Sequence, residues 1–563
     1  MATRALSTIA RRWAQWCANH LFLLLSTFAT AVYLLTMDHS VSWWDCGEFI
    51  ATGWTLGVGH PPGAPAYQLL AHLFMLLSFG NPLWVAPLSN ALSALCGGLT
   101  VGLLGITLRE LRVRPLAAVV GALCYLFCDT AWFSAVESEV YALAMLCCAL
   151  EVYLALRYRH TGNGRLLLLL ALTAGLGLGV HLMTLLVLPA IVVLIVARRP
   201  RLRLLAMALP FFLLGLTPYA IVPIRAQAQP TINEYGDNFK QYITREQYAK
   251  APLYPRMWRE RDSLNWNTWN AGRTDLLGNT VYYTTYQLGY MYGRYLMYNF
   301  IGRENLKHRH VVLFVLPFLL GVWGLLIHRR RSRRNFWTVM MLFLFGGVLL
   351  NIYLNHPCYE PRERDYVYVL SFYAFAIWIG LGADALAGYR RWRWLMLLAP
   401  LTLALGNWSD HDRSRCHSVH DIAAAHLESC DSGAILITLG DNDTFPLWYL
   451  QQVEGLRTDV SIYNLGLTGW RNILEILANN NFQRPVYVSH YFYQRYARLF
   501  PGRLRCEGFC WQLMPSEGYD LTPIIHDGIE WHITDHEYID PIATSFLTIW
   551  EHNTGAQKNF PIF

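Results

Sequence analysis

Two carboxylates follow the first long apolar segment, within the stretch Trp43–Pro65, which reads WWDCGEFIATGWTLGVGHPPGAP. Asp45 and Glu48 are three residues apart, so a helix between them would place both on one face. Such a helix must end near His60, where two prolines and flanking glycines break the run. Ionisable groups at the edge of a membrane are costly and are usually kept for function. The stretch therefore predicts a carboxylate that takes a proton from a substrate. The alternative is a solvated loop whose acids face water.

Further polar groups lie in short connections between apolar runs. One turn carries two acids, an arginine ends a span, and the connection Asn355–Tyr366 holds five charged residues. The candidate binding residues are His60, Glu137, Glu139, Tyr141, His181, Arg225, Asn233, Glu234, Arg362, Arg364, Asp365 and Tyr366. Any one cluster could be a helix cap or a group of salt bridges. Several clusters on one side of a membrane favour one shared polar site.

The composition is that of a polytopic membrane protein. Of the 563 residues, 54% are hydrophobic and only 15% are charged, whereas a soluble protein carries about 25% charged residues. Several apolar runs approach or exceed the roughly 20 residues that cross a bilayer. They fall at 21–37, 83–108, 115–133, 140–157, 165–180, 182–197, 204–224, 310–328, 336–355, 366–386 and 394–408. The net charge of +7 resides in arginine clusters between these runs, so it does not indicate nucleic-acid binding.

Two local patterns within this frame have structural explanations. Arg4, Arg11 and Arg12 precede the apolar run Leu21–Leu35 without a small-residue cleavage site, so we expect a retained anchor. Three glycines, Gly175, Gly177 and Gly179, lie inside an apolar run. They predict close packing of helices rather than a dinucleotide site.

The arginine clusters predict which loops face outward. With about eleven crossings and the amino terminus inside, the clusters at 109–114, 157–165, 198–203, 329–334 and 390–393 all fall in the cytoplasm. This agreement requires residues 66–79 to lie in the membrane interface instead of crossing it. The first outer loop (38–82), a large outer loop (225–308) and everything after about 408 then lie outside.

The tail from 409 to 563 has the pattern of an α/β domain. Ala434–Gly440 predicts a buried strand, Phe445–Val453 a helix and Thr458–Leu465 a second strand. Asp441 and Asp443 follow the first strand, where open α/β sheets bind ligands. Either acid could instead cap the helix. Cys506 and Cys510 are placed for a possible local disulfide.

The outer polar groups suit a reaction in which a sugar leaves a lipid phosphate and joins a hydroxyl. Such a site must sit at the membrane surface, because the lipid tail of the donor stays in the bilayer. Asp45 or Glu48 would take the hydroxyl proton, and Arg225, Arg362 or Arg364 would hold the phosphate. We expect no tightly bound metal, since arginine can meet a single phosphate. An oxygen site for magnesium or manganese on Asp441 and Asp443, or on Glu137 and Glu139, stays open.

Several motifs together carry a family resemblance. They are Trp44–Phe49, His60–Pro65, the Glu137/Glu139 turn, residues 361–368 (PRERDYVY) and Gly440–Pro446. With these motifs the chain resembles a bacterial family of membrane proteins of formerly unassigned function. That family is related to the animal protein O-mannosyltransferase that modifies the IPT domains of plexins. The resemblance covers most of the chain, and the relatives in that family have a longer soluble tail.

The resemblance implies a mainly α, GT-C fold of about eleven transmembrane helices over residues 1–408, with an α/β domain at 409–563 on the outer face. It also implies a polyprenyl-phosphate-linked sugar that is transferred to Ser or Thr of exported proteins. Mannose is the expected sugar, and another sugar stays open. Asp45 is the implied catalytic acid and Glu48 the second candidate. The implied location is a bacterial inner membrane, with the site on the periplasmic face.

Two other functions remain open from the sequence. A GT-C enzyme could modify a lipid or a cell-wall glycan rather than a protein. A transporter or flippase of a lipid-linked sugar would place facing polar residues within its spans, often in broken helices of paired halves. Here the acids and arginines concentrate at one face, and no internal repeat is visible.

Overall fold

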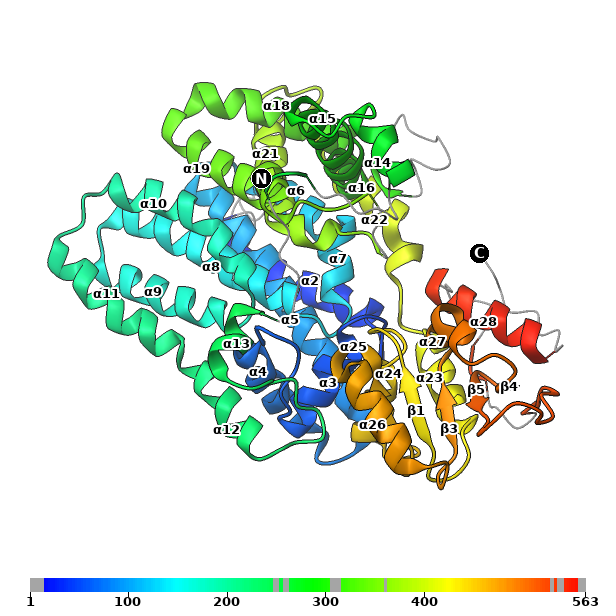
Figure 1. Cartoon of the computed structure of the whole chain (residues 1–563). Helices are drawn as coiled ribbons and strands as arrows, with labels where there is room; N and C mark the ends of the chain where they lie inside the picture. The colour runs from blue at the N-terminus through cyan, green and yellow to red at the C-terminus, as the bar shows by residue number, and fades with distance from the viewer. Residues whose placement is uncertain are drawn as a thin grey trace, which may run out of the picture.

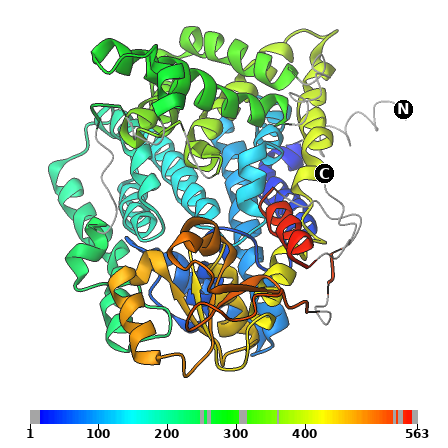
Figure 2. The same ribbon diagram turned by 45° about the vertical axis from the view of Figure 1, so that its right-hand side comes forward.

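A computed structural model describes residues 15–246, 253–256, 263–303, 315–358, 362–526, 531–533 and 541–554. A body of packed helices occupies most of the molecule, and a smaller α/β unit lies against one end of it (Figure 1). The rotated view also places this unit beside the segment coloured dark blue, which contains α3 (Cys46–Thr55) and α4 (Pro65–Met75) (Figure 2).

Each of the eleven apolar runs contains helix. The corresponding elements are α2 (Leu21–Thr36), α5 (Val85–Glu110), α6 (Pro115–Leu126) with α7 (Asp129–Ala135), α8 (Val140–Thr161), α9 (Gly164–Leu178), α10 (Leu188–Val196), α11 (Leu202–Gly215) with α12 (Ile221–Gln227), α18 (Leu316–Arg331), α19 (Arg333–Phe343) with α20 (Leu349–Leu354), α21 (Val369–Leu386) and α22 (Leu398–His411).

Within the described residues, five helices are long and apolar enough to cross a membrane. They span Pro82–Glu110, Val140–Thr161, Leu202–Gln227, Arg333–Leu354 and Asp365–Leu386. The sixth candidate is the pair α6–α7, which is bent by 68° within the apolar run 115–133. Four further apolar helices of 10–17 residues accompany them. The count of about eleven crossings stays a prediction.

Glycine allows two of these helices to approach closely. A side chain at Gly175 on α9 would collide with the backbone of Phe212 and Gly215 on α11. Small residues let helix backbones meet in this way. The interpretation of this glycine as a packing residue is confirmed.

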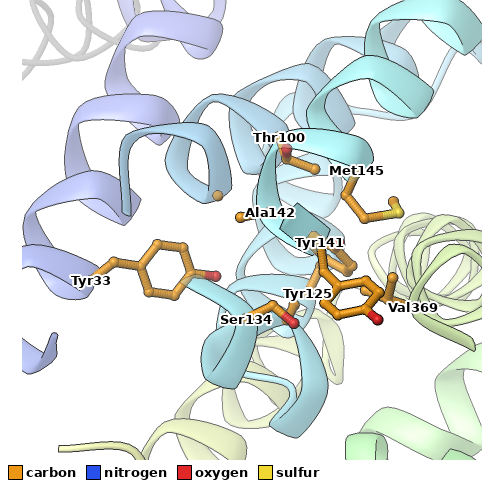
Figure 3. A pocket seen from close by; sticks show the side chains of 10 residues that line it. Tyr33, Thr100, Tyr125, Ser134, Tyr141, Ala142, Met145 and Val369 are labelled. Carbon is orange, nitrogen blue, oxygen red and sulfur yellow. The ribbon is translucent and has the colours of Figure 1, made fainter. Parts of the chain in front are cut away.

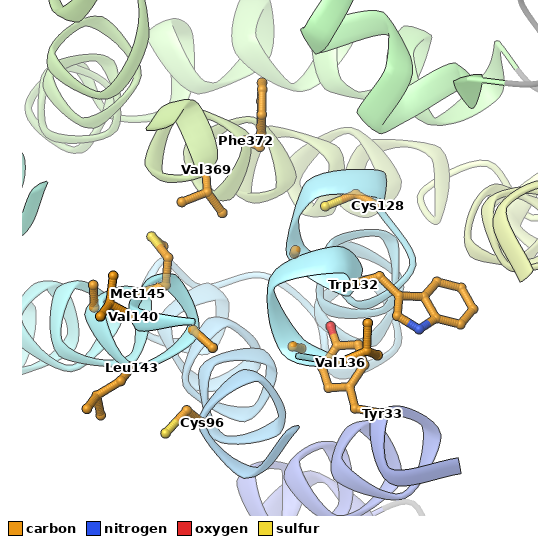
Figure 4. Packing of buried hydrophobic residues seen from close by; sticks show 14 of the residues in the cluster. Tyr33, Cys96, Cys128, Trp132, Val136, Val140, Leu143, Met145, Val369 and Phe372 are labelled. Atoms are coloured by element: carbon orange, nitrogen blue, oxygen red, sulfur yellow. The ribbon is translucent and has the colours of Figure 1, made fainter. Parts of the chain in front are cut away.

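Buried aromatic residues position the turn that carries Glu137 and Glu139. The Trp132 indole donates to Thr36 Oγ1 at 2.9 Å, and the Tyr33 hydroxyl donates to the Leu126 carbonyl at 2.9 Å. Figure 4 shows Tyr33 and Trp132 side by side in this packing. The Asp38 amide then donates to the Val136 carbonyl at 2.9 Å. The segment that begins at Asp38 is thereby joined to the turn.

Residues 225–308 contain short helices as well. They are α13 (Phe239–Thr244), α14 (Ser263–Asn270), α15 (Leu276–Tyr282), a π-helical segment (Tyr283–Gly293) and α16 (Arg294–Ile301). Residues 365–368 form a short 3-10 turn at the start of α21. Glu360, one of the charged residues of that connection, lies outside the described residues.

The α/β unit contains a five-stranded sheet in the order β2-β1-β3-β5-β4. The strands are β1 (Ile435–Thr438), β2 (Ser461–Asn464), β3 (Val486–Val488), β4 (Leu504–Glu507) and β5 (Cys510–Leu513). β1 pairs in parallel with β2 and β3, whereas β5 is antiparallel to β3 and β4. The predicted strand–helix–strand unit is confirmed. Its helix is α24 (Phe445–Tyr449), continued by a π-helical turn over Leu450–Glu454.

Helices cover both faces of this sheet. Ile435 and Ile437 pack on the side of α25 (Leu465–Thr468), α26 (Trp470–Asn480) and α27 (His490–Tyr496). Leu436 faces the other way, toward α23 (Ser418–Glu428) and α28 (Pro541–Thr554). This alternation is what a strand buried on both faces requires.

The proposed local disulfide is not supported by the sheet register. Cys506 pairs with Trp511, and Cys510 pairs with Glu507. Neighbouring residues of a strand point to opposite faces, so the two thiols point away from each other. Both cysteines are free in the structure.

Candidate active site

The helix α3 carries both carboxylates that the sequence singled out. Asp45 occupies its N-cap position, and the helix ends at Leu56, whose φ is +52°. The predicted helix before the His-Pro-Pro-Gly segment is therefore confirmed. Gly47 meets the Phe445 carbonyl so closely that any side chain there would collide with it. The α/β unit thus rests directly on the first turn of α3.

Glu48 forms a tight pair with His60. The His60 amide donates to Glu48 Oε1 at 2.6 Å, and the ring Nδ1 lies 2.6 Å from Oε2. Glu48 is fully buried, and a side chain at Gly59 would collide with its carboxylate. Burial alone would lower the pKa of His60, but the charge and hydrogen bond of Glu48 outweigh it and raise that pKa to about 10. His60 is therefore a cation at neutral pH.

Asp45 faces Arg362, which comes from the connection before α21. Arg362 Nη2 lies 3.6 Å from Asp45 Oδ2. The guanidinium stacks between the rings of Trp44 and Tyr366, at 4.4 and 4.5 Å from their centroids. Each of the two ion-pair partners keeps 17% of its side chain exposed. A solvent-accessible carboxylate beside a fixed arginine can receive a proton next to a bound anion.

Three more carboxyl groups interact electrostatically with this site. Glu139 is 4% exposed, and its Oε2 has no hydrogen-bond partner in the described chain. Glu234 is aligned beside the His60 segment, because its amide donates to the Val58 carbonyl at 2.8 Å. Burial, together with the charges of Asp45 and Glu48, raises the pKa of Asp441 to about 6. The α/β unit therefore contributes a side chain to the site on α3.

Aromatic and histidine side chains extend the cluster. The Tyr141 ring lies 4.8 Å from Tyr366 and 5.3 Å from His181, measured between ring centroids. Tyr141 also lines a small cavity with Tyr33, Tyr125 and others (Figure 3). The predicted group of Tyr141, His181 and Tyr366 is thus brought together at the edge of the site.

Several predicted binding residues are instead held by structural partners. Arg225 donates from Nε and Nη2 to the carbonyls of Leu56 and Thr55, where it closes the end of α3 beside a second small cavity. The others are Arg364 (to Tyr366), Asp365 (from Thr130), Asn233 (to the Ala226 carbonyl), Glu137 (with Arg413) and Asp443 (with Ser489). In this structure these residues shape the site rather than face it.

Asp443 joins two strand ends of the sheet. Its Oδ2 accepts from the Leu439 amide at 2.8 Å and from the Ser489 hydroxyl. Burial raises its pKa to about 7. Asp443 therefore bridges the ends of β1 and β3, whereas Asp441, two residues earlier, lies near α3.

Sequence reasoning did not predict the contacts of Trp44, Asn442 and Arg413. Trp44 adopts a positive φ of 62° and donates its amide to Asn442 Oδ1 at 2.6 Å. Arg413 pairs with Glu137 at 2.8 Å. No local pattern identifies these contacts, because each joins segments several hundred residues apart. The stretch Gly440–Pro446 was the available signal for Asn442, since it belonged to the recognised motifs.

The Glu137–Arg413 pair is expected to hold the α/β unit to the helical body. Burial raises the pKa of Glu137 to about 7 although the charge of Arg413 lowers it, so removing Arg413 takes away the cation that pairs with this buried carboxylate directly. Breaking one side of a buried pair typically costs about 3–5 kcal/mol. We expect Arg413→Gln to lower stability by about 3 kcal/mol, measured by thermal unfolding in detergent.

Arg415→Gln is the matched control, because Arg415 is exposed two residues away. Glu137→Gln should lower the stability less than Arg413→Gln does, since a neutral amide needs no cation. Equal melting temperatures for the Arg413 and Arg415 variants would contradict the role of the pair.

Two family models match parts of the chain. A family model described as the protein O-mannosyl-transferase TMEM260 N-terminal domain matches residues 45–204, and a second, TMEM260-associated domain 2, matches residues 419–471. The first range begins at Asp45 and includes Glu48, His60 and Glu139. The second includes Asp441.

Two curated relatives match most of the chain. The mouse protein O-mannosyl-transferase TMEM260 is 26% identical over 487 residues, which cover 79% of this chain and 63% of the relative. The Dictyostelium discoideum protein O-mannosyl-transferase tmem260 is 22% identical over 524 residues, with 84% and 60% covered. The chain therefore spans about six-tenths of the length of these relatives.

Solved structures show weaker likeness. ArnT from Cupriavidus metallidurans in the apo state has a TM-score of 0.41 at 15% identity, covering 90% of this chain and 100% of that one. The Archaeoglobus fulgidus oligosaccharyltransferase has a TM-score of 0.47 at 11% identity, with 84% and 70% covered. The S. cerevisiae Pmt1–Pmt2 complex has a TM-score of 0.32 at 19% identity, with 37% and 34% covered. TM-scores this low support no conclusion about mechanism. The matched sequence families relate this chain to the TMEM260 family of protein O-mannosyl-transferases.

Proposed function

We propose that the protein is a membrane glycosyltransferase that moves a sugar, mannose, from a polyprenyl phosphate to Ser or Thr hydroxyls of exported proteins. The observation that carries the proposal is the pairing of Asp45 with Arg362 at the start of α3. It supplies a carboxylate for the hydroxyl proton and a guanidinium for the phosphate within one site. The relatives named as protein O-mannosyl-transferases support the choice of sugar and of a protein acceptor.

The proposed reaction requires few parts from the protein. Asp45 accepts the proton of the attacking hydroxyl as its oxygen bonds to the anomeric carbon of the sugar. The bond between that carbon and the phosphate oxygen breaks, and the lipid phosphate leaves as an anion. Arg362 stabilises this charge, and its planar fork is fixed by the two rings on either side. Glu48 is engaged with His60 through both oxygens, so it positions α3 rather than acting as the base.

The proposed site lies on the extracytoplasmic side of the membrane, and the α/β unit selects the acceptor there. The arginine clusters support this orientation. The test uses purified full-length chain in detergent, a polyprenyl-phosphate mannose and an acceptor peptide. Release of lipid phosphate that depends on the peptide, with mannose found on the peptide, is the expected result. If release of lipid phosphate requires a lipid or a glycan instead of the peptide, the acceptor is not a protein. If the lipid-linked sugar is transported without release of lipid phosphate, the protein is not a glycosyltransferase.

Asp441 is expected to affect the acceptor more than the donor, because it enters the site from the α/β unit. Its pKa of about 6 means that it is protonated below that pH and ionised above it. If the ionised form binds the acceptor, the KM for peptide should fall between pH 5 and pH 7. In Asp441→Asn this change should disappear, while the KM for donor stays the same.

The groups that act on Asp441 are Asp45, Glu48, His60 and Arg362, and all four remain in the variant. Glu475→Gln, at an exposed position on α26, serves as the control within the same unit. If the KM for peptide depends on pH equally in Asp441→Asn and in the control, Asp441 takes no part in acceptor binding.

A further inference from the structure

The orientation of Arg362 depends on the backbone that carries it. Its guanidinium stacks between the rings of Trp44 and Tyr366 and lies 3.6 Å from Asp45, which is longer than a hydrogen bond. Neither kind of contact fixes the direction of the planar fork as a hydrogen bond would. If the arginine is to meet a phosphate in one orientation, the connection around it must be fixed by other contacts.

The Tyr295 hydroxyl holds the two residues that follow Arg362. Tyr295 lies on α16 and is only 2% exposed. Its hydroxyl donates to Glu363 Oε2 at 2.6 Å and accepts from the Arg364 amide at 3.0 Å. Since a hydroxyl has one donor and two acceptor positions, this single group serves both residues at once. The connection is thereby tied to α16 at two consecutive positions.

The third residue of the connection is held by Thr130 on α7. The Thr130 hydroxyl is buried and donates to Asp365 Oδ2 at 2.6 Å. Asn299 of α16 accepts from the Thr130 amide at 3.0 Å and donates to its hydroxyl at 2.9 Å. Arg303, just after α16, pairs with Asp129 of α7 at 2.9 Å. The two helices therefore form one hydrogen-bonded unit behind the connection.

We propose that Tyr295 and Thr130 are positioning residues for the lipid phosphate. They fix residues 363–365 and thereby orient the guanidinium of Arg362 toward the donor. This inference rests on the proposed function, in which Arg362 holds the phosphate. Orientation matters there, because a misplacement of about 1 Å can cost roughly 10²-fold in rate. Through Arg362, α16 acts on a donor that it does not itself touch.

The alternative is that these hydrogen bonds only stabilise the fold. A positioning role lowers the fraction of folded molecules in which Arg362 is correctly oriented, so its loss weakens donor binding in proportion. A purely structural role lowers the melting temperature and leaves the donor affinity of the folded protein unchanged. The two roles are therefore separated by measuring both quantities on the same variants.

The test measures equilibrium binding of polyprenyl-phosphate mannose and the melting temperature of the purified full-length chain. Tyr295→Phe removes one hydroxyl and keeps the ring. We expect it to weaken donor binding about three- to tenfold, which corresponds to the net free energy of a hydrogen bond. Thr130→Val removes the bond to Asp365 and should act in the same direction, which gives a second variant if the first fails to fold.

Tyr292→Phe is the matched control. Tyr292 is a buried tyrosine in the π-helical segment directly before α16, and its hydroxyl has no hydrogen-bond partner among the described residues. Its donor affinity should equal that of the wild type. If Tyr295→Phe and Thr130→Val also bind the donor as the control does, the positioning role is rejected, whatever their melting temperatures.

A double-mutant cycle separates this inference from the proposed function. In the Arg362→Lys background, Tyr295→Phe should weaken donor binding by less than about twofold, because the group that it orients is already gone. If the two losses multiply instead, Tyr295 acts independently of Arg362 and the inference is wrong, while the proposed role of Arg362 stands. If Arg362→Lys alone binds the donor normally, the proposed role of Arg362 fails, and the inference fails with it.

Discussion

Asp45→Asn is expected to lower the rate of sugar transfer by about 10²–10⁴-fold, the usual cost of losing a general base. Asparagine keeps the shape of the side chain but cannot accept the proton of the hydroxyl. The position is partly exposed and lies at the end of a helix, without a side-chain cap hydrogen bond. Folding should therefore be largely preserved. Single-turnover kinetics with polyprenyl-phosphate mannose and acceptor peptide measure the effect.

Glu48→Gln is the comparison that assigns the base. Glu48 already accepts two hydrogen bonds from His60 and is fully buried, so it has no access to an incoming hydroxyl. Its replacement should loosen the pairing with His60 and lower the melting temperature as well as the rate. If Asp45→Asn retains near wild-type turnover while Glu48→Gln does not, the base has been assigned to the wrong carboxylate.

Local chemistry was sufficient to predict the elements of the site. The glycines and prolines after Thr55 mark the end of α3, and hydrophobic periodicity marks β1, α24 and β2. The spacing of Asp45 and Glu48 predicted that a helix would place them on one face, and the structure has Asp45 at the N-cap of α3 and Glu48 in its first turn. Such signals depend on neighbouring residues, which the sequence displays directly.

Long-range partners were not predictable in the same way. Arg225 was expected at the phosphate, but it binds two carbonyls that lie 169 and 170 residues earlier. An unsatisfied helix end needs donors, and the sequence does not reveal which arginine supplies them. The contact of Asn442 with Trp44, 398 residues apart, is equally invisible. What decides the role of an arginine is therefore its partner, and the partner depends on the tertiary fold.

Arg362→Lys is expected to weaken donor binding by roughly 10–100-fold. Lysine keeps the charge but loses the bidentate fork, and a hydrogen bond to a charged group is worth about 1.5–3 kcal/mol, where 1.4 kcal/mol corresponds to tenfold. Lysine would also lose much of the packing between Trp44 and Tyr366. Turnover should fall as well, since the charge on the phosphate grows as it leaves. Equilibrium binding of the donor lipid and single-turnover rates measure the two effects separately.

The structure supplies two matched controls for this variant. Arg364 donates to the Tyr366 hydroxyl at 2.6 Å, and Arg225 donates to the end of α3. Glu363 pairs with Arg294 at 2.8 Å and accepts from the Tyr295 hydroxyl at 2.6 Å. Glu363 therefore fixes the connection before α21 rather than orienting Arg362 directly. Arg364→Lys and Arg225→Lys should therefore change donor affinity less than Arg362→Lys does.

Each other outcome has a definite meaning for this connection. A larger loss of donor affinity in Arg225→Lys than in Arg362→Lys would indicate that the phosphate binds in the cavity that Arg225 lines with Leu56, Gln68 and Ile221. Normal donor binding and turnover in all three lysine variants would show that the phosphate is held elsewhere and that the connection is only structural. A loss confined to Arg362→Lys identifies the guanidinium between Trp44 and Tyr366 as the group that holds the leaving phosphate. The ordered charges before α21 would then be explained by the need to keep that one side chain in place.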